Sequence, residues 1–264
     1  MNWLTVSQGD APLIVTFPHS GTDLADVEDQ FRSPEIARHD SDWWVDRLYA
    51  FAGALGATTI RTAICRSVID VNRDPSGASL YPGQVTTELC PTTTFEGDPL
   101  YADAPPDEAE IARRRERWFI PYHAAIGAEI ARLKERHGAV VLYDAHSIRS
   151  RVPRLFDGEL PLFNIGTNSG MSCAPALSQA VAQVCARSGH SHVVNGRFKG
   201  GWTTRHHGRP ATGVHAIQME LAMRFYLDEA GDWPPAYDKA RAAPLAAILH
   251  DVLADCLAFR EPTP

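Results

Sequence analysis

AVVLYDAHS (residues 139–147) is an apolar run followed by an aspartate and a histidine. A short apolar run of this kind predicts a strand that is buried in a sheet. Similar runs at 12–17, 57–62, 192–196 and 214–221 predict further strands. Polar residues lie at or just beyond the ends of several of these strands, and that pattern bears on function as well as on fold.

Segments with helical character alternate with the predicted strands. They lie at 42–56, 107–138, 173–189 and 237–259, and we expect the second of them to bend or break near Pro121. Strands that alternate with helices predict an α/β protein with a mixed, mainly parallel sheet. Helices should cover both faces of this sheet, which gives a three-layer α/β/α architecture.

Length and composition restrict the class of protein. The 264 residues suit a single domain, 1–264, with a long irregular loop at about 74–107 that is rich in proline, threonine and glycine. The net charge of −7 argues against general binding to nucleic acid or to anionic membranes. No apolar run is long enough for a transmembrane helix, and the first residues do not resemble a secretory signal.

The five cysteines form no CxxC pair. We therefore expect a cytoplasmic monomer or small homo-oligomer without a disulfide framework.

Residues capable of chemistry follow three of the predicted strands. His19 follows the first, Asp144 and His146 end the strand at 139–147, and Glu220 ends the strand at 214–221. Ligands bind at the carboxyl ends of strands in such sheets, and neutral imidazole is a preferred zinc donor. Each residue also has an ordinary explanation: a turn for His19, a loop-capping carboxylate for Asp144 and a helix surface for Glu220. If Asp144 is functional, it either binds a metal or orients a ligand.

RHDSDWW (38–44) offers two carboxylates just before a predicted helix. Asp40 or Asp42 could be the N-cap of this helix, because aspartate and serine are favoured there. Either could instead be the carboxylate ligand of a metal. The spacing alone leaves both explanations open.

Two further segments concentrate cationic side chains. DVNRDP (70–75) contains Asn72 and Arg73, and arginine binds carboxylates through a planar two-pronged contact. NGRFKGGWTTRHHG (195–208) contains Arg197, Lys199, Arg205, His206 and His207. In an acidic protein these residues indicate either an anion pocket or a flexible, solvated loop. The sequence has no GxSxG, GxxxxGK[ST] or HExxH motif, which argues against serine-hydrolase, nucleotide-binding and thermolysin-like sites.

Six blocks occur in an order that resembles a known family: PHSGTDL, HDSDWWVDRLY, VIDVNRDPSGASLYPGQ, LYDAHSIRSRVPRLFDG, NGRFKGGWTTRHHGRP and HAIQMELA. Together they resemble the N-formylglutamate amidohydrolase (N-formylglutamate deformylase) family of histidine degradation, over about residues 10–255. The resemblance implies a phosphorylase/hydrolase-like fold related to zinc carboxypeptidases. It also implies metal-dependent hydrolysis of N-formyl-L-glutamate to formate and L-glutamate.

The same resemblance implies roles for individual residues. His19 and His146 become zinc ligands, and Glu220 becomes the general base. Asn72 and Arg73 would hold one substrate carboxylate. Arg197 and Arg205 would hold the second carboxylate or the oxyanion, and His206 would also contact substrate. The implied partner is thus a small dicarboxylic N-acyl amino acid.

One position departs from the carboxypeptidase pattern H-x-x-E. Its glutamate is replaced here by Thr22, which is a poor zinc ligand. We predict Asp42 as the third ligand, with Asp40 and Asp23 as alternatives. Another divalent transition metal could replace zinc. Two other functions stay open: a zinc deacylase or carboxypeptidase for another N-acyl amino acid, and a non-catalytic binder of acidic metabolites.

Overall fold

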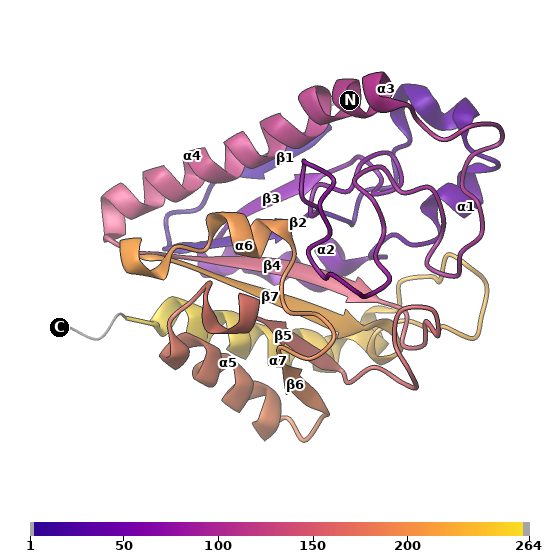
Figure 1. The fold of residues 1–264 in the computed structure, drawn as a ribbon. Coiled ribbons are helices and arrows are strands. Elements are labelled where there is room, and N and C mark those ends of the chain that lie inside the picture. Colours follow the sequence, from indigo (N-terminus) through magenta and orange to yellow (C-terminus); the bar gives the residue numbers. More distant parts are fainter. Residues whose placement is uncertain (1–2, 261–264) are drawn as a thin grey trace.

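The computed structural model describes residues 3–260 and contains one seven-stranded sheet (Figure 1). The strand order is β1-β3-β2-β4-β7-β5-β6, and four of the six neighbouring pairs are parallel. The strands are β1 (Leu4–Ser7), β2 (Leu13–Phe17), β3 (Thr58–Thr62), β4 (Val140–Ile148), β5 (Phe163–Gly166), β6 (His192–Val194) and β7 (Val214–Ala222). The prediction of a mixed, mainly parallel sheet is confirmed.

Helices cover both faces of the sheet. They are α1 (Pro34–Arg38), α2 (Val45–Leu48), α3 (Glu108–Arg114), α4 (Ile120–His137), α5 (Pro175–Arg187), α6 (Trp202–His207) and α7 (Lys239–Ala258). Figure 1 shows α4 along one face and α5 and α7 along the other. This arrangement confirms the three-layer α/β/α architecture.

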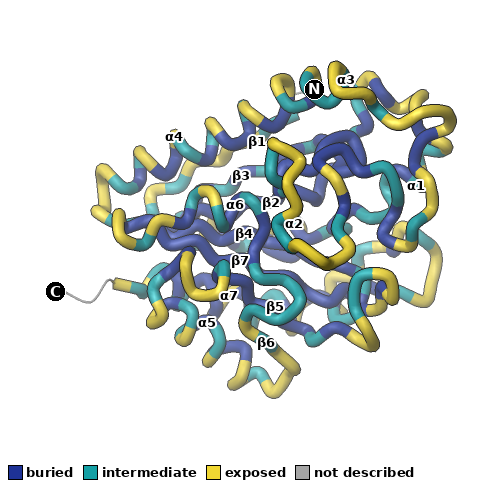
Figure 2. Tube along the Cα trace, in the orientation of Figure 1, coloured by how far each residue is buried: buried dark blue, intermediate teal, exposed yellow. Residues whose placement is uncertain are grey.

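The side chains of the central strands divide between two cores. On β4, Tyr143 packs in the core that includes α5 and α7, whereas Leu142 packs in the core that includes α4. This alternation follows from the two-residue repeat of a strand. All nine residues of β4 and of β7 are buried, and Figure 2 shows both strands buried along their length. Strands buried on both faces explain why the sequence reads as continuous apolar runs.

Parallel strands bring their carboxyl ends to one edge of the sheet. The arrowheads of β4 and β7 in Figure 1 point to the same side, where the irregular segment 74–107 also lies. No helix or strand lies between Thr62 and Glu108 in this described part of the chain, as the sequence predicts for 74–107. The long loop thus lies at the edge where polar strand ends meet.

Two predicted helices differ from the expectation. The segment 42–56 is divided into α2 and a 3-10 helix, Ala50–Leu55, because Tyr49 leaves the helical conformation at φ −94° and ψ 18°. The segment 107–138 is not broken at Pro121. A π-helical turn, Arg115–Phe119, joins α3 to α4 there, and such a wider turn accommodates a residue that lacks a backbone N–H.

Two strands were not predicted. Both β1 and β5 have four residues, so their sequence pattern is short, and β1 is largely exposed. Each runs antiparallel to the strand that it joins from the central block. No helix among residues 3–260 is long and apolar enough to cross a membrane.

Candidate active site

Three buried residues bring possible metal ligands together at the carboxyl edge of the sheet. His19 lies two residues beyond β2, His146 lies on β4, and Asp42 lies before α2. Their ligand atoms all lie within 4.8 Å of one another. Asp42 Oδ2 lies 3.1 Å from His146 Nδ1 and 3.8 Å from His19 Nδ1. The structure therefore brings together the three residues predicted as ligands.

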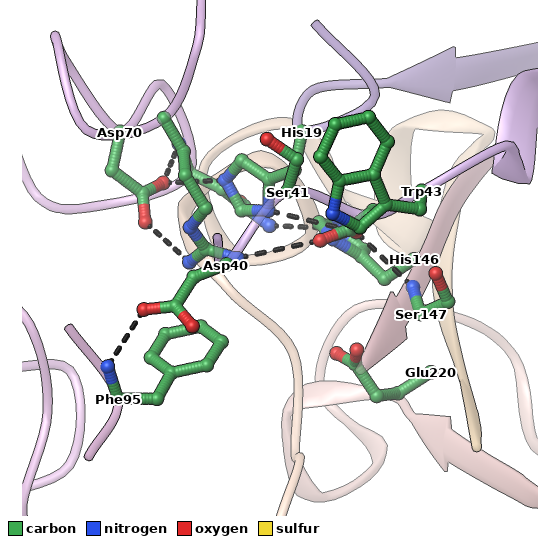
Figure 3. A network of polar contacts seen from close by, with 12 residues as sticks. His19, Asp40, Ser41, Trp43, Asp70, Phe95, His146, Ser147 and Glu220 are labelled. Atoms are coloured by element: carbon green, nitrogen blue, oxygen red, sulfur yellow. Dashed lines mark hydrogen bonds and ion pairs between the residues drawn. The ribbon is translucent and has the colours of Figure 1, made fainter. Parts of the chain in front are cut away.

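Local backbone contacts fix this cluster. The N–H of Asp42 donates to the carbonyl of His19 at 3.0 Å, and the N–H of Ser147 donates to Asp42 Oδ2 at 3.1 Å. Gly21 allows the chain after His19 to pass close to β3, because a Cβ atom at this position would lie 2.4 Å from the carbonyl group of Ala63. The two loops that carry His19 and Asp42 are thus tied to each other and to β4. Figure 3 shows His19, Ser41, Trp43 and Ser147 around this contact.

Buried carboxylates orient both imidazoles. His19 Nε2 donates to Asp70 Oδ1 at 2.6 Å, and His146 Nε2 donates to Asp144 Oδ2 at 2.9 Å. Both rings therefore turn Nδ1 toward Asp42. This is the arrangement in which a carboxylate fixes the tautomer of a metal-binding histidine.

The donor set fits a metal ion. His19 Nδ1 is buried and has no hydrogen-bond partner among the described residues. Burial of such an atom is costly unless it is satisfied by a ligand. Two imidazole nitrogens and one carboxylate oxygen match the usual protein ligands of a catalytic zinc, which keeps a fourth position open.

Charges around the cluster shift the pKa values of its members. Burial lowers the pKa of His19, and Arg66 acts in the same direction, so this imidazole is held neutral. Burial opposes ionisation of Asp70, but His19, Arg73 and Arg66 hold its pKa well below the usual range. Despite burial, the hydrogen bond from His146 lowers the pKa of Asp42. The neutral imidazole of His19 beside ionised carboxylates is the protonation state that a cation requires. Although burial opposes it, Asp144 raises the pKa of His146 well above its usual value, so a cation would displace a proton from this second ring.

The alternative ligands have other partners. Asp40 Oδ2 accepts from the N–H of Phe95 at 2.6 Å, as Figure 3 shows, and its Oδ1 accepts from Arg149. Asp23 Oδ1 accepts from the N–H of Ala25 at 2.8 Å. The structure does not bring Asp40 or Asp23 together with the two histidines.

Glu220 lies beside this cluster on β7. In the parallel ladder between β4 and β7 it is the Cα partner of His146. Burial, together with the charge of Asp42, raises the pKa of Glu220 to about 8, although His146 opposes this shift. Glu220 is on a strand and not on a helix surface, and a buried carboxyl with a raised pKa is suited to proton transfer.

A pocket opens onto these residues. Its polar lining includes His19, Arg66, Asn72, Arg73, Tyr81, Thr87, His146, Arg197, Gln218 and Glu220. Arg197 donates only to the carbonyl oxygens of Leu155 and Val85, and it forms no ion pair with a carboxylate of residues 3–260. An arginine in a pocket without an acidic partner indicates an anionic ligand.

Other predicted binding residues lie differently. Arg205 donates to the carbonyl of Gly200, and its guanidinium lies 4.9 Å from the centre of the Tyr81 ring. His206 is exposed and stacks on Trp202. Neither Arg205 nor His206 lines the pocket. Asn72 lines it, but both ends of its carboxamide bind protein groups.

Sequence reasoning missed Asp70 and Arg66. Arg66 is buried, donates to Asp70 at 2.8 Å and lies 3.4 Å from Asp42 Oδ1. Asp70 precedes Asn72 by two residues, and that spacing could have indicated it. Arg66 precedes its partner Asp70 by four residues, but its second partner, Asp42, lies on another part of the chain.

Comparisons with known proteins match one family over most of the chain. A family model described as N-formylglutamate amidohydrolase matches residues 11–227. An N-formylglutamate deformylase of Pseudomonas aeruginosa is 46% identical over 260 residues, which are 97% of this chain and 96% of the relative. One of Pseudomonas putida is 44% identical over 259 residues, with the same coverage of 97% and 96%. A crystal structure of N-formylglutamate amidohydrolase from Ralstonia eutropha JMP134 has a TM-score of 0.79 and 25% identity, covering 98% of this chain and 97% of that one.

Proposed function

The chain belongs to the N-formylglutamate amidohydrolase family, and from this premise we propose that it hydrolyses N-formyl-L-glutamate to formate and L-glutamate with the help of a divalent metal ion. The reaction would be the last step of a histidine degradation route in the cytoplasm. The observation that carries the proposal is the cluster of His19, Asp42 and His146 beside Glu220, in a pocket that also contains Arg197.

His19, Asp42 and His146 would hold the metal through two Nδ1 atoms and Asp42 Oδ2. We propose zinc, because this donor set is common at catalytic zinc sites. When bound, zinc supplies Lewis acidity, which polarises a carbonyl group and makes a water molecule more acidic. Asp70 and Asp144 accept from Nε2 of the two imidazoles and so direct each Nδ1 toward the place where the metal would bind.

Glu220 would move the proton. Gln218 Nε2 donates to Glu220 Oε2 at 3.3 Å, whereas no described protein group donates to Oε1. Oε1 is therefore the atom that takes a proton from the attacking water and passes it to the departing amide nitrogen. Enclosure of Glu220 in a buried pocket limits access of bulk water to this transfer.

Arg73 and Arg197 would bind the two carboxylates of the substrate. Both line the pocket, and Arg73 keeps its orientation by donating to Thr87. For Arg205 we propose a supporting position against Tyr81 instead of contact with the oxyanion, because it does not line the pocket.

A substrate comparison tests the proposal. Purified protein is stripped of metal with a chelator, reloaded with zinc and assayed on N-formyl-glutamate, N-acetyl-aspartate and N-formyl-methionine. We expect formate release from N-formyl-glutamate to be fastest, to be lost on chelation and to return with zinc. Equal rates on all three substrates would refute the assignment of N-formyl-glutamate as the substrate. Undiminished activity after chelation would refute the dependence on a metal ion.

A further inference from the structure

Two carboxamides, those of Asn72 and Gln218, lie in the pocket between the start of α6 and the proposed reacting groups. Both are buried, with 2% and 4% of their surface exposed. Each accepts a hydrogen bond from a backbone N–H at the beginning of α6. These N–H groups have no partner within the helix, because the first turn of a helix leaves its donors free.

The start of α6 sets the orientation of the Asn72 carboxamide. The N–H of Thr203 donates to Asn72 Oδ1 at 2.7 Å, and the N–H of Trp202 donates to the Asn72 carbonyl at 3.1 Å. The NH₂ end must therefore face the other way. There it donates to Asp144 Oδ2 at 3.0 Å and lies 2.9 Å from His146 Nε2.

The Gln218 carboxamide is oriented in the same manner. The N–H of Gly201 donates to Gln218 Oε1 at 2.7 Å. Its NH₂ end then donates to Glu220 Oε2 at 3.3 Å. A single short backbone segment, Gly201–Thr203, thus determines which end of each carboxamide faces the site.

Gly201 is required for this arrangement. A Cβ atom at position 201 would lie 2.5 Å from the carboxamide atoms of Asn72. A larger residue would displace either α6 or Asn72, because real side chains do not approach so closely.

We propose that Asn72 and Gln218 are positioning residues that transmit the placement of α6 to His146 and Glu220, and that Asn72 does not bind the substrate carboxylate. Asn72 shares Asp144 Oδ2 with His146 and so helps to hold this carboxylate where it orients the imidazole. Gln218 holds one oxygen of Glu220 and leaves the other for the proton. The inference rests on the proposed function.

Asn72→Ala tests the proposed role of Asn72 in positioning His146. The zinc affinity of the metal-free protein is measured by competition with a chromophoric chelator, and kcat and KM are measured separately. We expect zinc binding to weaken by about 10- to 100-fold, as is usual when an outer partner of a histidine ligand is lost. We also expect kcat to fall while KM changes by less than about threefold. A KM raised more than about tenfold, with zinc affinity and kcat unchanged, would instead show that Asn72 binds substrate.

Gly201→Ala gives an independent measurement in case Asn72→Ala does not fold. It keeps the Asn72 side chain but displaces it, so zinc binding should weaken here too. Unchanged zinc affinity in a folded Gly201→Ala protein would overturn the role of Asn72.

Gln218→Met tests the proposed role of Gln218 in positioning Glu220. Methionine keeps the length of the side chain but neither accepts a hydrogen bond from Gly201 nor donates one to Glu220. We expect kcat to fall by about tenfold with zinc affinity unchanged. An unchanged kcat would refute the role of Gln218.

Ser172→Ala is the matched control. Ser172 is also buried and donates to the carbonyl of Ala216 on β7 at 2.8 Å, but it does not line the pocket. The Ser172→Ala substitution should lower the thermal unfolding temperature without changing zinc affinity or kcat. Zinc affinity is measured without substrate, so absence of turnover in the wild-type protein would refute the proposed function, while the zinc measurements would still decide the role of Asn72.

Discussion

His146 on β4 and Glu220 on β7 are Cα partners in a parallel ladder, so a proposed metal ligand and the proposed general base leave neighbouring strands at the same height. Side chains at paired positions of adjacent strands point to the same face of a sheet. The separation of the two groups is thus determined by strand pairing, which is far stiffer than a loop. His19 and Asp42 lie in loops instead, and their positions depend on the hydrogen bonds that join Asp42 to His19 and to Ser147.

The assignment of Asp42 as a ligand predicts a clear difference between two aspartates. Asp42→Asn removes the anionic oxygen between the two histidines, so zinc affinity should fall by more than the roughly 10- to 100-fold that loss of an outer partner causes. Asp40→Asn is the matched control and should bind zinc within about threefold of wild type, because Asp40 is bonded to Phe95 and Arg149. Titration calorimetry on the metal-free proteins measures both. Loss of zinc binding in the Asp40 variant alone would reverse the assignment.

Glu220→Gln should separate proton transfer from metal binding. Glutamine keeps the size of the side chain but cannot take a proton, so kcat should fall by about 10²- to 10⁴-fold. Zinc content, measured by atomic emission, should stay at the wild-type level because Glu220 is not among the three clustered ligands. A variant that retains full kcat would rule out Glu220 as the base.

Arg197 should determine affinity for a dicarboxylic substrate. A hydrogen bond to a charged group contributes about 1.5–3 kcal/mol, so Arg197→Ala should raise KM for N-formyl-glutamate by roughly 10- to 150-fold. The rise should be much smaller for whichever analogue, N-formyl-glutamine or the α-amide, lacks the carboxylate that Arg197 binds.

Arg205→Ala is the control for Arg197, since both guanidinium groups lie over the Tyr81 ring but only Arg197 lines the pocket. Its KM should stay within about threefold of wild type. If both variants raised KM equally for every substrate, the effect would come from loss of support for Tyr81.

The parts of the site that lie within strands could be predicted from sequence. Asp144 and His146 follow an apolar run at a spacing of two, which places them on one face of a strand. The choice between Asp40 and Asp42 could not be made in this way, because both precede a helix by a few residues. It depends on a contact 55 residues away in sequence, between Asp40 and the N–H of Phe95.

The cationic segment 195–208 shows a second limit of sequence reasoning. Its composition left an anion pocket and a flexible, solvated loop as alternatives, and Arg197 does line the pocket. Residues 202–207, however, form the short helix α6, in which Arg205 donates to the carbonyl of Gly200 and His206 stacks on Trp202, and neither lines the pocket. A local pattern gives the chemistry of a segment, but the direction of each side chain depends on how the segment folds.

A buried histidine pair outside the pocket predicts how stability depends on pH. His123 Nε2 donates to the carbonyl of Val71 at 2.7 Å, and its Nδ1 lies 3.0 Å from His207 Nε2. Burial lowers the pKa of His123 to about 4, below its ordinary value of 6.5. The unfolded chain therefore takes up this proton first as the pH falls. The contribution of neutral His123 to the free energy of unfolding is complete above about pH 6.5. It is lost as the pH falls from 6.5 to 4, by about 1.4 kcal/mol for each pH unit.

Denaturant unfolding at pH 7.5 and pH 5 measures this loss. His123→Gln keeps a donor for the Val71 carbonyl but cannot be protonated, so its free energy of unfolding should fall by about 2 kcal/mol less than that of wild type between these two values. His190→Gln replaces an exposed histidine and is the control, which should lose as much stability as wild type. Other groups also titrate in this range. The prediction therefore concerns the difference between variants in how steeply the free energy of unfolding falls with pH. Equal slopes for wild type and His123→Gln would show that His123 is already protonated in the folded protein at pH 5.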